Sequence, residues 1–190
     1  YGDTAIPLSA TASSGLPVSF VMVSGPASLS GSTLTITGAG SIIVKASQAG
    51  STNYSAGADV QQTIAVSARA LTITANNASR AYGAVNPATP GFTAPGLAAG
   101  DAISGVTYAY AATATSTANV GTTHAITPSG AVFTSGSASN YAITYVDGAL
   151  TIAGTASQSI SFTAPASKVY GDTAITLSAT ASSGLPVSFA

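Results

Sequence analysis

Alternating apolar and polar positions run through most of the chain. In many short segments Val, Ile, Leu, Tyr or Phe occupies every second position, with Thr, Ser, Ala or Gln between them. This period of two is typical of β-strands with one buried face. It predicts strands at Leu34–Ile36, Ile42–Val44, Val60–Val66, Leu71–Ile73, Val106–Tyr110, Tyr141–Tyr145, Leu150–Ile152, Ile160–Phe162 and Ile175–Leu177.

Turn-forming residues separate these segments, among them Ser24-Gly25-Pro26, Gly38-Ala39-Gly40 and Ser183-Gly184. Asp147-Gly148 lies between two alternating runs and predicts a short β-hairpin. No long window keeps a helical apolar stripe. About seven short strands in roughly 85 residues are typical of an immunoglobulin-like sandwich. We therefore predict an all-β fold of tandem immunoglobulin-like β-sandwich modules in a linear array, without significant helix.

A near-exact internal repeat sets the domain organisation. Residues 170–189 match residues 1–20 at nineteen of twenty positions, with an offset of 169 residues. A weaker repeat divides this period into two modules of similar plan. We expect the C-terminal part of a module A at residues 1–67, a module B at residues 68–154, and the N-terminal part of the next module A at residues 155–190.

The composition excludes several function classes. Only 5% of the 190 residues are charged, the net charge is −1, and there is no cysteine. Disulfide, zinc-thiolate and cysteine-nucleophile chemistry are therefore excluded. Four basic residues form no patch for phosphate contacts, so nucleic acid is not an expected partner. No apolar run approaches the roughly 20 residues of a membrane span.

Two short motifs recur and are the candidate structural motif of the chain. The first motif is Tyr-Gly-Asp or Tyr-Gly-Ala, and its residues are Tyr1, Gly2, Asp3, Tyr82, Gly83, Tyr170, Gly171 and Asp172. The second motif is Asn-Tyr, at Asn53, Tyr54, Asn140 and Tyr141. A structural interpretation gives Gly an unusual backbone angle, Asp a capping role and Tyr a place at the sandwich edge. The alternative makes Asp3 and Asp172 calcium ligands, although calcium takes 6–8 oxygens.

Other residues with reactive side chains lack the neighbours that catalysis needs. His124 is the single histidine, and no serine lies in a nucleophile-elbow context. Isopeptide bonds from Lys45 or Lys168 to Asn need a buried acid, and acids are scarce. Tyrosines of two strands are candidates for sugar stacking or for cross-strand packing, namely Tyr108, Tyr110, Tyr141 and Tyr145. We predict no catalytic residue, no cofactor and no enzyme activity.

Module B resembles the MBG domains (mostly-beta, glycine-rich) of large bacterial surface proteins. The matching stretches are residues 71–83, Asn86-Pro87, Gly100-Asp101, Ser139-Asn140-Tyr141 and residues 147–152. Module A resembles the bacterial immunoglobulin-like repeats that alternate with them, through residues 158–162, Tyr170-Gly171-Asp172, residues 177–187, Ala49-Gly50 and Asn53-Tyr54. The resemblance implies an extracellular, adhesin-like protein of the bacterial surface without catalytic residues. Ala84 stands where the other copies have Asp3 and Asp172.

Three functions remain open. The first is a structural stalk or fibre section, in which each repeat contacts neighbouring repeats of the same chain. The second is a filament subunit, joined head-to-tail to neighbouring copies by strand complementation. The third is a module that binds glycan or calcium. The surface ligand of such a protein is not identified by the sequence.

Overall fold

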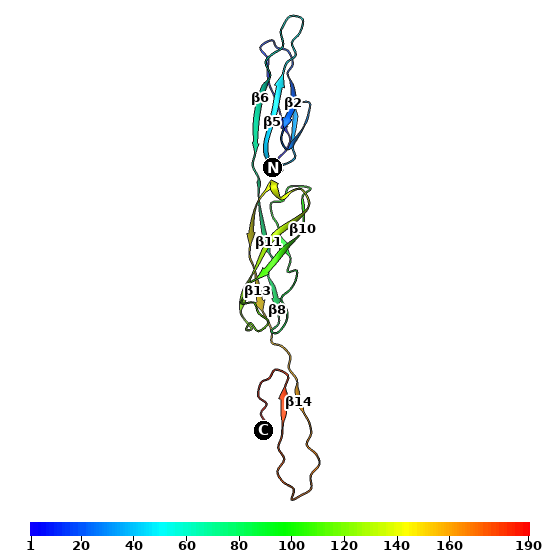
Figure 1. Ribbon diagram of the computed structural model, residues 1–190, viewed down its shortest axis with the longest axis vertical. Coiled ribbons are helices and arrows are strands. Elements are labelled where there is room, and N and C mark those ends of the chain that lie inside the picture. The colour runs from blue at the N-terminus through cyan, green and yellow to red at the C-terminus, as the bar shows by residue number, and fades with distance from the viewer.

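The computed structural model describes residues 1–190 as three parts that follow one another along a line (Figure 1). We call residues 1–67 the first domain, residues 68–154 the second domain and residues 155–190 the C-terminal segment. No sheet combines strands from two of these parts. The predicted all-β fold is confirmed: the chain has fifteen strands, and its one helical element is the 3₁₀ turn η1, Ala138–Asn140.

The first domain buries its core between two three-stranded sheets. One sheet has the order β1-β4-β3 and the other β2-β5-β6. Their bounds are β1 Ile6–Pro7, β2 Ser19–Ser24, β3 Ala27–Ser30, β4 Thr33–Ile36, β5 Gly40–Ser47 and β6 Val60–Val66. Leu34 from one sheet and Ile42 and Val44 from the other form the centre of the core. Apolar side chains at alternate positions therefore face inward, as their period of two predicts.

The second domain also has two sheets, with the orders β12-β7-β9 and β10-β11-β13-β8. The bounds are β7 Arg69–Ala75, β8 Ala78–Arg80, β9 Phe92–Thr93, β10 Ala102–Tyr110, β11 Thr123–Ser135, β12 Tyr141–Val146 and β13 Gly148–Ile152. Its core has two clusters, one around Leu71 and Ile73 and the other around Ile126, Leu150 and Ile152.

The predicted hairpin at Asp147-Gly148 is wrong. Strand β12 pairs in parallel with β7, whereas β13 pairs with β11 and β8 in the other sheet. The chain therefore crosses between sheets at Asp147, next to the place where β7 crosses to β8. Gly148 has no positive φ, which a type I′ hairpin turn requires. Its backbone instead passes so close to β7 that a β-carbon would lie 2.6 Å from the carbonyl oxygen of Ala75.

Replacing Gly148 with alanine is expected to destabilise the second domain by about 1–3 kcal/mol, because the added methyl overlaps backbone that cannot move aside. Gly105 in β10 is the matched control, since a β-carbon there meets no atom within 4 Å. Urea unfolding of both variants measures the difference. Equal stabilities for Gly148→Ala and Gly105→Ala would contradict the close crossing.

A buried arginine joins two loops at the lower end of the second domain. Arg80 is 7% exposed. Its Nε donates to Oδ1 of Asn86 at 2.7 Å, and its Nη atoms donate to the carbonyl oxygens of Ala81 and Thr115. Asn86 in turn donates from Nδ2 to the carbonyl oxygen of Ala114 at 3.0 Å. The guanidinium thus finds carbonyl and amide acceptors rather than a carboxylate.

The C-terminal segment contains one pair of strands, β14 (Ile160–Phe162) and β15 (Ala179–Ala181). The predicted strand at Ile175–Leu177 is absent. In the first domain the matching residues Ile6 and Pro7 pair with Leu34 and Thr33 of β4. The counterpart of β4 in the repeat would lie beyond residue 190, so this segment has no strand against which Ile175 can pair.

Candidate functional site: the junction between the first and second domains

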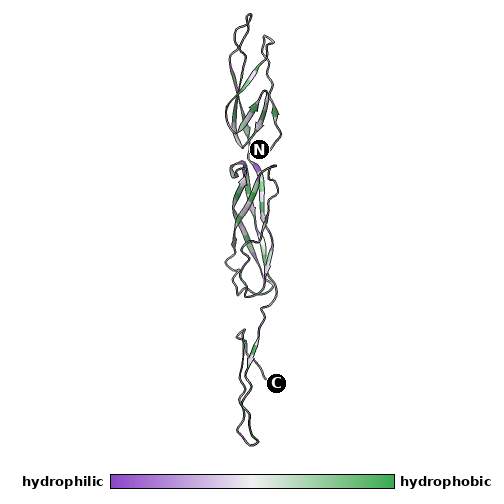
Figure 2. Cartoon of the chain, turned by 90° about the vertical axis from the view of Figure 1, so that its right-hand side faces the viewer, coloured by the Kyte–Doolittle hydropathy of each residue, from purple (hydrophilic) through white to green (hydrophobic).

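The lower end of the first domain meets the upper end of the second domain beside Tyr1, where Figure 2 shows hydrophilic residues of the second domain close to the N-terminus. Only Ser67 and Ala68 separate strand β6 from strand β7. Several contacts surround this short link. They come from parts of the chain that are about 100 residues apart, as the following distances show.

One carboxylate holds tyrosines of both domains. Oδ2 of Asp101 accepts hydrogen bonds from the hydroxyl groups of Tyr1, at 2.9 Å, and of Tyr141. The two rings also touch edge to face, with their centroids 5.6 Å apart. Tyr141 is only 6% exposed, and its oxygen accepts a further bond from the backbone N–H of Ala98 at 2.9 Å. Asp101 thereby fixes the first domain to the core of the second.

A second contact runs in parallel to the first. Asn140, at the end of η1, is 7% exposed, and its Oδ1 accepts a hydrogen bond from the backbone N–H of Ala39 at 3.0 Å. Ala39 belongs to the Gly38-Ala39-Gly40 turn, which enters β5 of the first domain. A β-carbon on Gly38 would lie 3.0 Å from the same Oδ1 atom. The glycine therefore lets the turn approach the asparagine closely.

Gly2 fits the junction for two reasons. Its φ is +82°, a conformation that costs glycine little. A β-carbon at this position would lie 2.9 Å from Nη1 of Arg69 and 3.0 Å from Cβ of Ala98. Arg69 itself is held by a bond from its Nε to the carbonyl oxygen of Gly96 at 2.8 Å. In the Tyr-Gly pair, the ring of Tyr1 thus contacts the second domain, and Gly2 leaves the space that this close contact requires.

Replacing Gly2 with alanine is expected to loosen the junction more than the same change at Gly171. Both glycines have a positive φ, so the backbone strain is shared, but Gly171 has no atom within 4 Å of its added methyl. The measurement is hydrogen exchange of the Ala39 amide, which donates across the junction to Asn140. Faster exchange only in Gly2→Ala is the expected result. Equal rates in the two variants would contradict a role of Gly2 in holding the junction together.

The tyrosine hydroxyl groups of the junction are held in their protonated form. Burial raises the pKa of the Tyr141 phenol, and the hydrogen bond to Asp101 raises it further, against a smaller opposite effect of the Ala98 N–H. Burial, followed by the bond to Asp101, also raises the pKa of Tyr1. A phenol whose pKa is raised in the folded state stabilises that state fully at any pH below the ordinary tyrosine pKa near 10. This stabilisation is lost as the pH rises through the raised pKa of the folded state.

Stability of the second domain is therefore expected to fall as the pH rises above about 10, toward the raised pKa values of the folded state. Tyr141→Phe is expected to flatten this fall, because the variant has no phenol to ionise at that position. Tyr54→Phe, with a ring 54% exposed at the far end of the first domain, is the control. Urea unfolding across the pH range checks the slope. An equally steep fall in Tyr141→Phe would assign the pH dependence to other groups.

The other residues of the two motifs lie away from this junction. Asn53 and Tyr54 are exposed in a loop of the first domain, and Tyr170, Gly171 and Asp172 are exposed in the C-terminal segment. Tyr82 and Gly83 form a turn at the lower end of the second domain, where the N–H of Gly83 donates to the carbonyl oxygen of Ser116 at 2.9 Å. The motifs thus mark domain ends, and one Tyr-Gly end meets one Asn-Tyr end in the structure.

The two weak calcium candidates do not come together. Asp3 is exposed in the first domain. Asp172 caps its own turn in the C-terminal segment, with Oδ2 accepting from the N–H of Val169 at 2.9 Å. No group of three or more His, Asp or Glu side chains has the spacing of a metal site. The structure therefore does not bring these two carboxylates together in one metal site.

The other reactive side chains have ordinary partners. Nδ1 and Nε2 of His124 each lie 2.9 Å from a threonine hydroxyl, that of Thr113 and that of Thr122. Nζ of Lys45 forms an ion pair with Asp59 at 2.8 Å. Tyr108 and Tyr110 pack against a core cluster. Asp101 and Arg69 were not expected at the site. Gly100-Asp101 belongs to the stretches that resemble MBG domains, which is the signal that could have pointed to Asp101, whereas Arg69 has no such signal.

Residues 71–151, fewer than half of the chain, match the model of a family described as the MBG domain (YGX type). The family match extends from Leu71 in β7 to Thr151 in β13, which includes Tyr82-Gly83 and Asn140-Tyr141. No curated protein and no solved structure matches the chain. The structure contains no helix with the length and apolar character of a membrane span. MBG domains are structural, repeat-type units rather than a known enzyme family. The matched residues 71–151 of the second domain are thus similar to the MBG domain of the YGX type.

Proposed function

We propose that this chain is a spacer: a non-catalytic, extracellular section of the stalk or fibre of a bacterial adhesin-like surface protein. The MBG match supports a structural repeat. The identity of residues 1–20 and 170–189 at nineteen positions supports continuation of the same architecture along a longer rod. In this role the chain holds a binding region at a distance from the cell, and its own surface needs no ligand.

The junction carries this proposal. A spacer keeps its length only if its domains do not fold back on one another. Here a link of two residues is reinforced by the Tyr1–Asp101–Tyr141 bonds on one side and the Ala39–Asn140 bond on the other. Short links favour a semi-rigid arrangement. Two contacts from separate loops restrict both bending and rotation, and the first two domains lie end to end (Figure 1).

Small-angle X-ray scattering of the wild-type chain and of Asp101→Ala tests the spacer function. The wild type is expected to scatter as an extended particle, and Asp101→Ala to have a smaller maximum dimension because its first domain bends about Ser67–Ala68. Asp59→Ala is the matched control, since it breaks an exposed ion pair inside the first domain. A wild-type chain as compact or as flexible as Asp101→Ala would contradict a spacer held by this junction.

A further inference from the structure

One side of the first domain is open between strands β2 and β3, each of which is the last strand of its sheet. A groove of about 770 Å³ follows this open side. Six of the ten residues that line it are apolar, among them Phe20 and Met22 of β2 and Leu29 of β3, and none of the ten carries a charge. The apolar interior of the domain therefore reaches the surface along this side of the sandwich.

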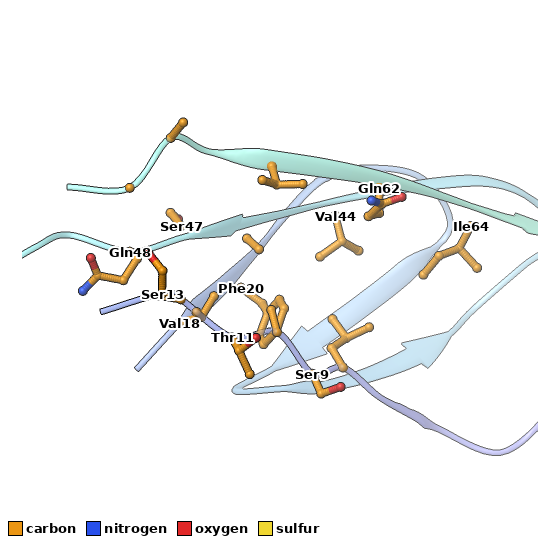
Figure 3. Close-up of a pocket in the computed structure, with 17 residues that line it drawn as sticks. Ser9, Thr11, Ser13, Val18, Phe20, Val44, Ser47, Gln48, Gln62 and Ile64 are labelled. Carbon is orange, nitrogen blue, oxygen red and sulfur yellow. The ribbon is translucent and has the colours of Figure 1, made fainter. Parts of the chain in front are cut away.

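The opposite side of the sandwich differs from this open side. There the extended segment 8–13 lines a second groove together with β5 and β6 (Figure 3). In the C-terminal segment, β14 pairs with β15, which is the counterpart of residues 10–12 in the repeat. A strand of the same polypeptide thus adds on the side of residues 10–12. Because β1 and β3 lie at opposite ends of their sheet, such a strand leaves β2 and β3 uncovered.

Strand β2 lacks the features that keep other edge strands from pairing. Strands β8 and β9 have only three and two residues, and the pairing of β10 contains several register shifts. Strand β12 is tied to β11 by Tyr145, whose hydroxyl oxygen accepts the N–H of Ala131 at 2.9 Å. Strand β2, in contrast, has six residues without a charge or a proline. Its free edge can therefore accept a further strand.

Both faces of β2 are apolar. Phe20 and Met22 line the groove, whereas Val21 and Val23 lie on the outward face and are 50% and 48% exposed. The solvated face of an antiparallel sheet ordinarily carries polar side chains, which alternate with the buried apolar ones. The valines of β2 depart from this alternation, and an added strand with the same two faces would cover them.

We propose that β2 pairs antiparallel with β2 of a second copy of this chain, so that the two sheets β2-β5-β6 become one continuous sheet. Val21 faces its own counterpart, and Phe20 faces Met22 of the other copy. This register uses the regular part of the strand, because the pairing of β2 with β5 shifts between Met22 and Ser24. The contact has two-fold symmetry, since the same surface serves on both copies.

Charge favours a second copy as the occupant. The charged side chain nearest to β2 in its sheet is Lys45, which lies beside Val21 in β5, and its ion pair with Asp59 neutralises it. Two β2 strands therefore meet without bringing unpaired like charges together. The uncharged grooves of the two copies also face each other across the new strand pair, so each copy shields the groove of the other from water.

The size of the contact determines how it acts. Six residues span about 20 Å and packed sheets lie about 10 Å apart, so each copy buries roughly 200 Å². A stable interface buries about 800 Å² per partner, so one pair is weak, whereas a rod that repeats this domain multiplies the contact. Because the strands of the first domain run along the long axis (Figure 1), an antiparallel pair joins rods that point in opposite directions. Such rods come from two facing cells, a meaning that rests on the proposed spacer function.

Disulfide cross-linking tests the register, because the chain has no cysteine of its own. Facing residues of an antiparallel pair have Cα atoms about 4.5–5.5 Å apart, which a disulfide spans. Under mild oxidation, Val21→Cys is expected to give about tenfold more linked dimer than Val132→Cys. Val132 is the matched control, because it is 58% exposed on β11 of the second domain. Equal yields would overturn the proposal.

Small-angle X-ray scattering of the linked Val21→Cys dimer tests the direction of the pairing. In the antiparallel pair the first domains lie side by side and the second domains extend to opposite ends. The maximum dimension of the dimer is then expected to exceed that of the monomer clearly. A parallel pair would thicken the particle without lengthening it, and that result would contradict the antiparallel contact.

Sedimentation of the unmodified chain at concentrations up to about 1 mM tests the association itself. The wild type is expected to pass from monomer to dimer, and Val21→Lys to stay monomeric, because a lysine on an edge strand opposes pairing. Val132→Lys is the control and is expected to dimerise like the wild type. A wild type that stays monomeric, or a Val21→Lys variant that dimerises equally, would overturn the proposal. Neither result affects the spacer function, which the scattering of the dilute, monomeric chain tests.

Discussion

Replacing Arg80 with alanine is expected to destabilise the second domain by about 3 kcal/mol, because three partly buried acceptors lose their donor at once and a buried side chain is removed. The guanidinium donates to Asn86, Ala81 and Thr115 from a position that is 7% exposed. Alanine leaves these groups without the donors of the guanidinium, and it also leaves a cavity at a position that is now buried. Urea unfolding of the second domain measures the loss.

Two variants separate the hydrogen bonds of Arg80 from its charge. Arg80→Lys keeps the charge, but a compact ammonium group does not reproduce the planar fork, so we expect an intermediate stability. Arg69→Ala serves as the matched control, since its one bond, to the carbonyl oxygen of Gly96, is exposed. If Arg80→Ala were no less stable than Arg69→Ala, the buried hydrogen bonds would not stabilise the domain.

Truncating one core leucine is expected to destabilise only the domain that contains it. Leu34 is 0% exposed in the first domain and Leu71 is 1% exposed in the second. Each change to alanine is expected to cost about 2–5 kcal/mol, from lost burial and the cavity that remains. Because the two leucines belong to separate core clusters, the free energy of unfolding of the other domain should change little.

Amide hydrogen exchange at Ile42 and Ile73, one residue in each core, distinguishes the two domains. Leu34→Ala is expected to speed exchange at Ile42 alone, and Leu71→Ala at Ile73 alone. Faster exchange at both sites in either variant would show that the junction couples the domains into one cooperative unit.

The sequence predicted the strands better than their partners. Alternation at Leu71–Ile73 and Tyr141–Tyr145 correctly indicated strands, because the period of two is a local property. The alternation gave no sign that these two strands pair in parallel, because 70 positions separate Leu71 from Tyr141 and a local pattern does not connect them. Asp147-Gly148 was interpreted as a hairpin from its two residues alone, whereas the close approach of Gly148 to Ala75 depends on that distant strand.

Strand β11 was missed for a definite reason. It contains Pro128 and Gly130, and proline rarely occurs in the middle of a sheet because it has no N–H to donate. The structure accommodates Pro128 beyond Ile126, the last residue of β11 that pairs with β13. No carbonyl group of β13 lies opposite Pro128 in the sheet, so the missing N–H of the proline breaks no hydrogen bond with that strand. This arrangement depends on where β13 ends, which no local pattern records.

The junction was predictable only in part. The Tyr-Gly and Asn-Tyr pairs drew attention because they recur, and two of the pairs meet there. Asp101, which joins the two tyrosines, occurs in no repeated motif, and Ala39 contributes only its backbone. Interactions made by single carboxylates and main-chain groups leave no periodic signal in a sequence.

The parallel pairing of the second domain determines how it would carry tension. Its first strand, β7, is reached from the first domain, and its last strand, β13, leads to the C-terminal segment at the other end (Figure 1). β7 is paired with β12 through six residues, and β8 with β13 through three. A pull along the long axis draws these neighbours past each other in opposite directions. Their hydrogen bonds are then loaded in shear and share the force, instead of breaking one after another.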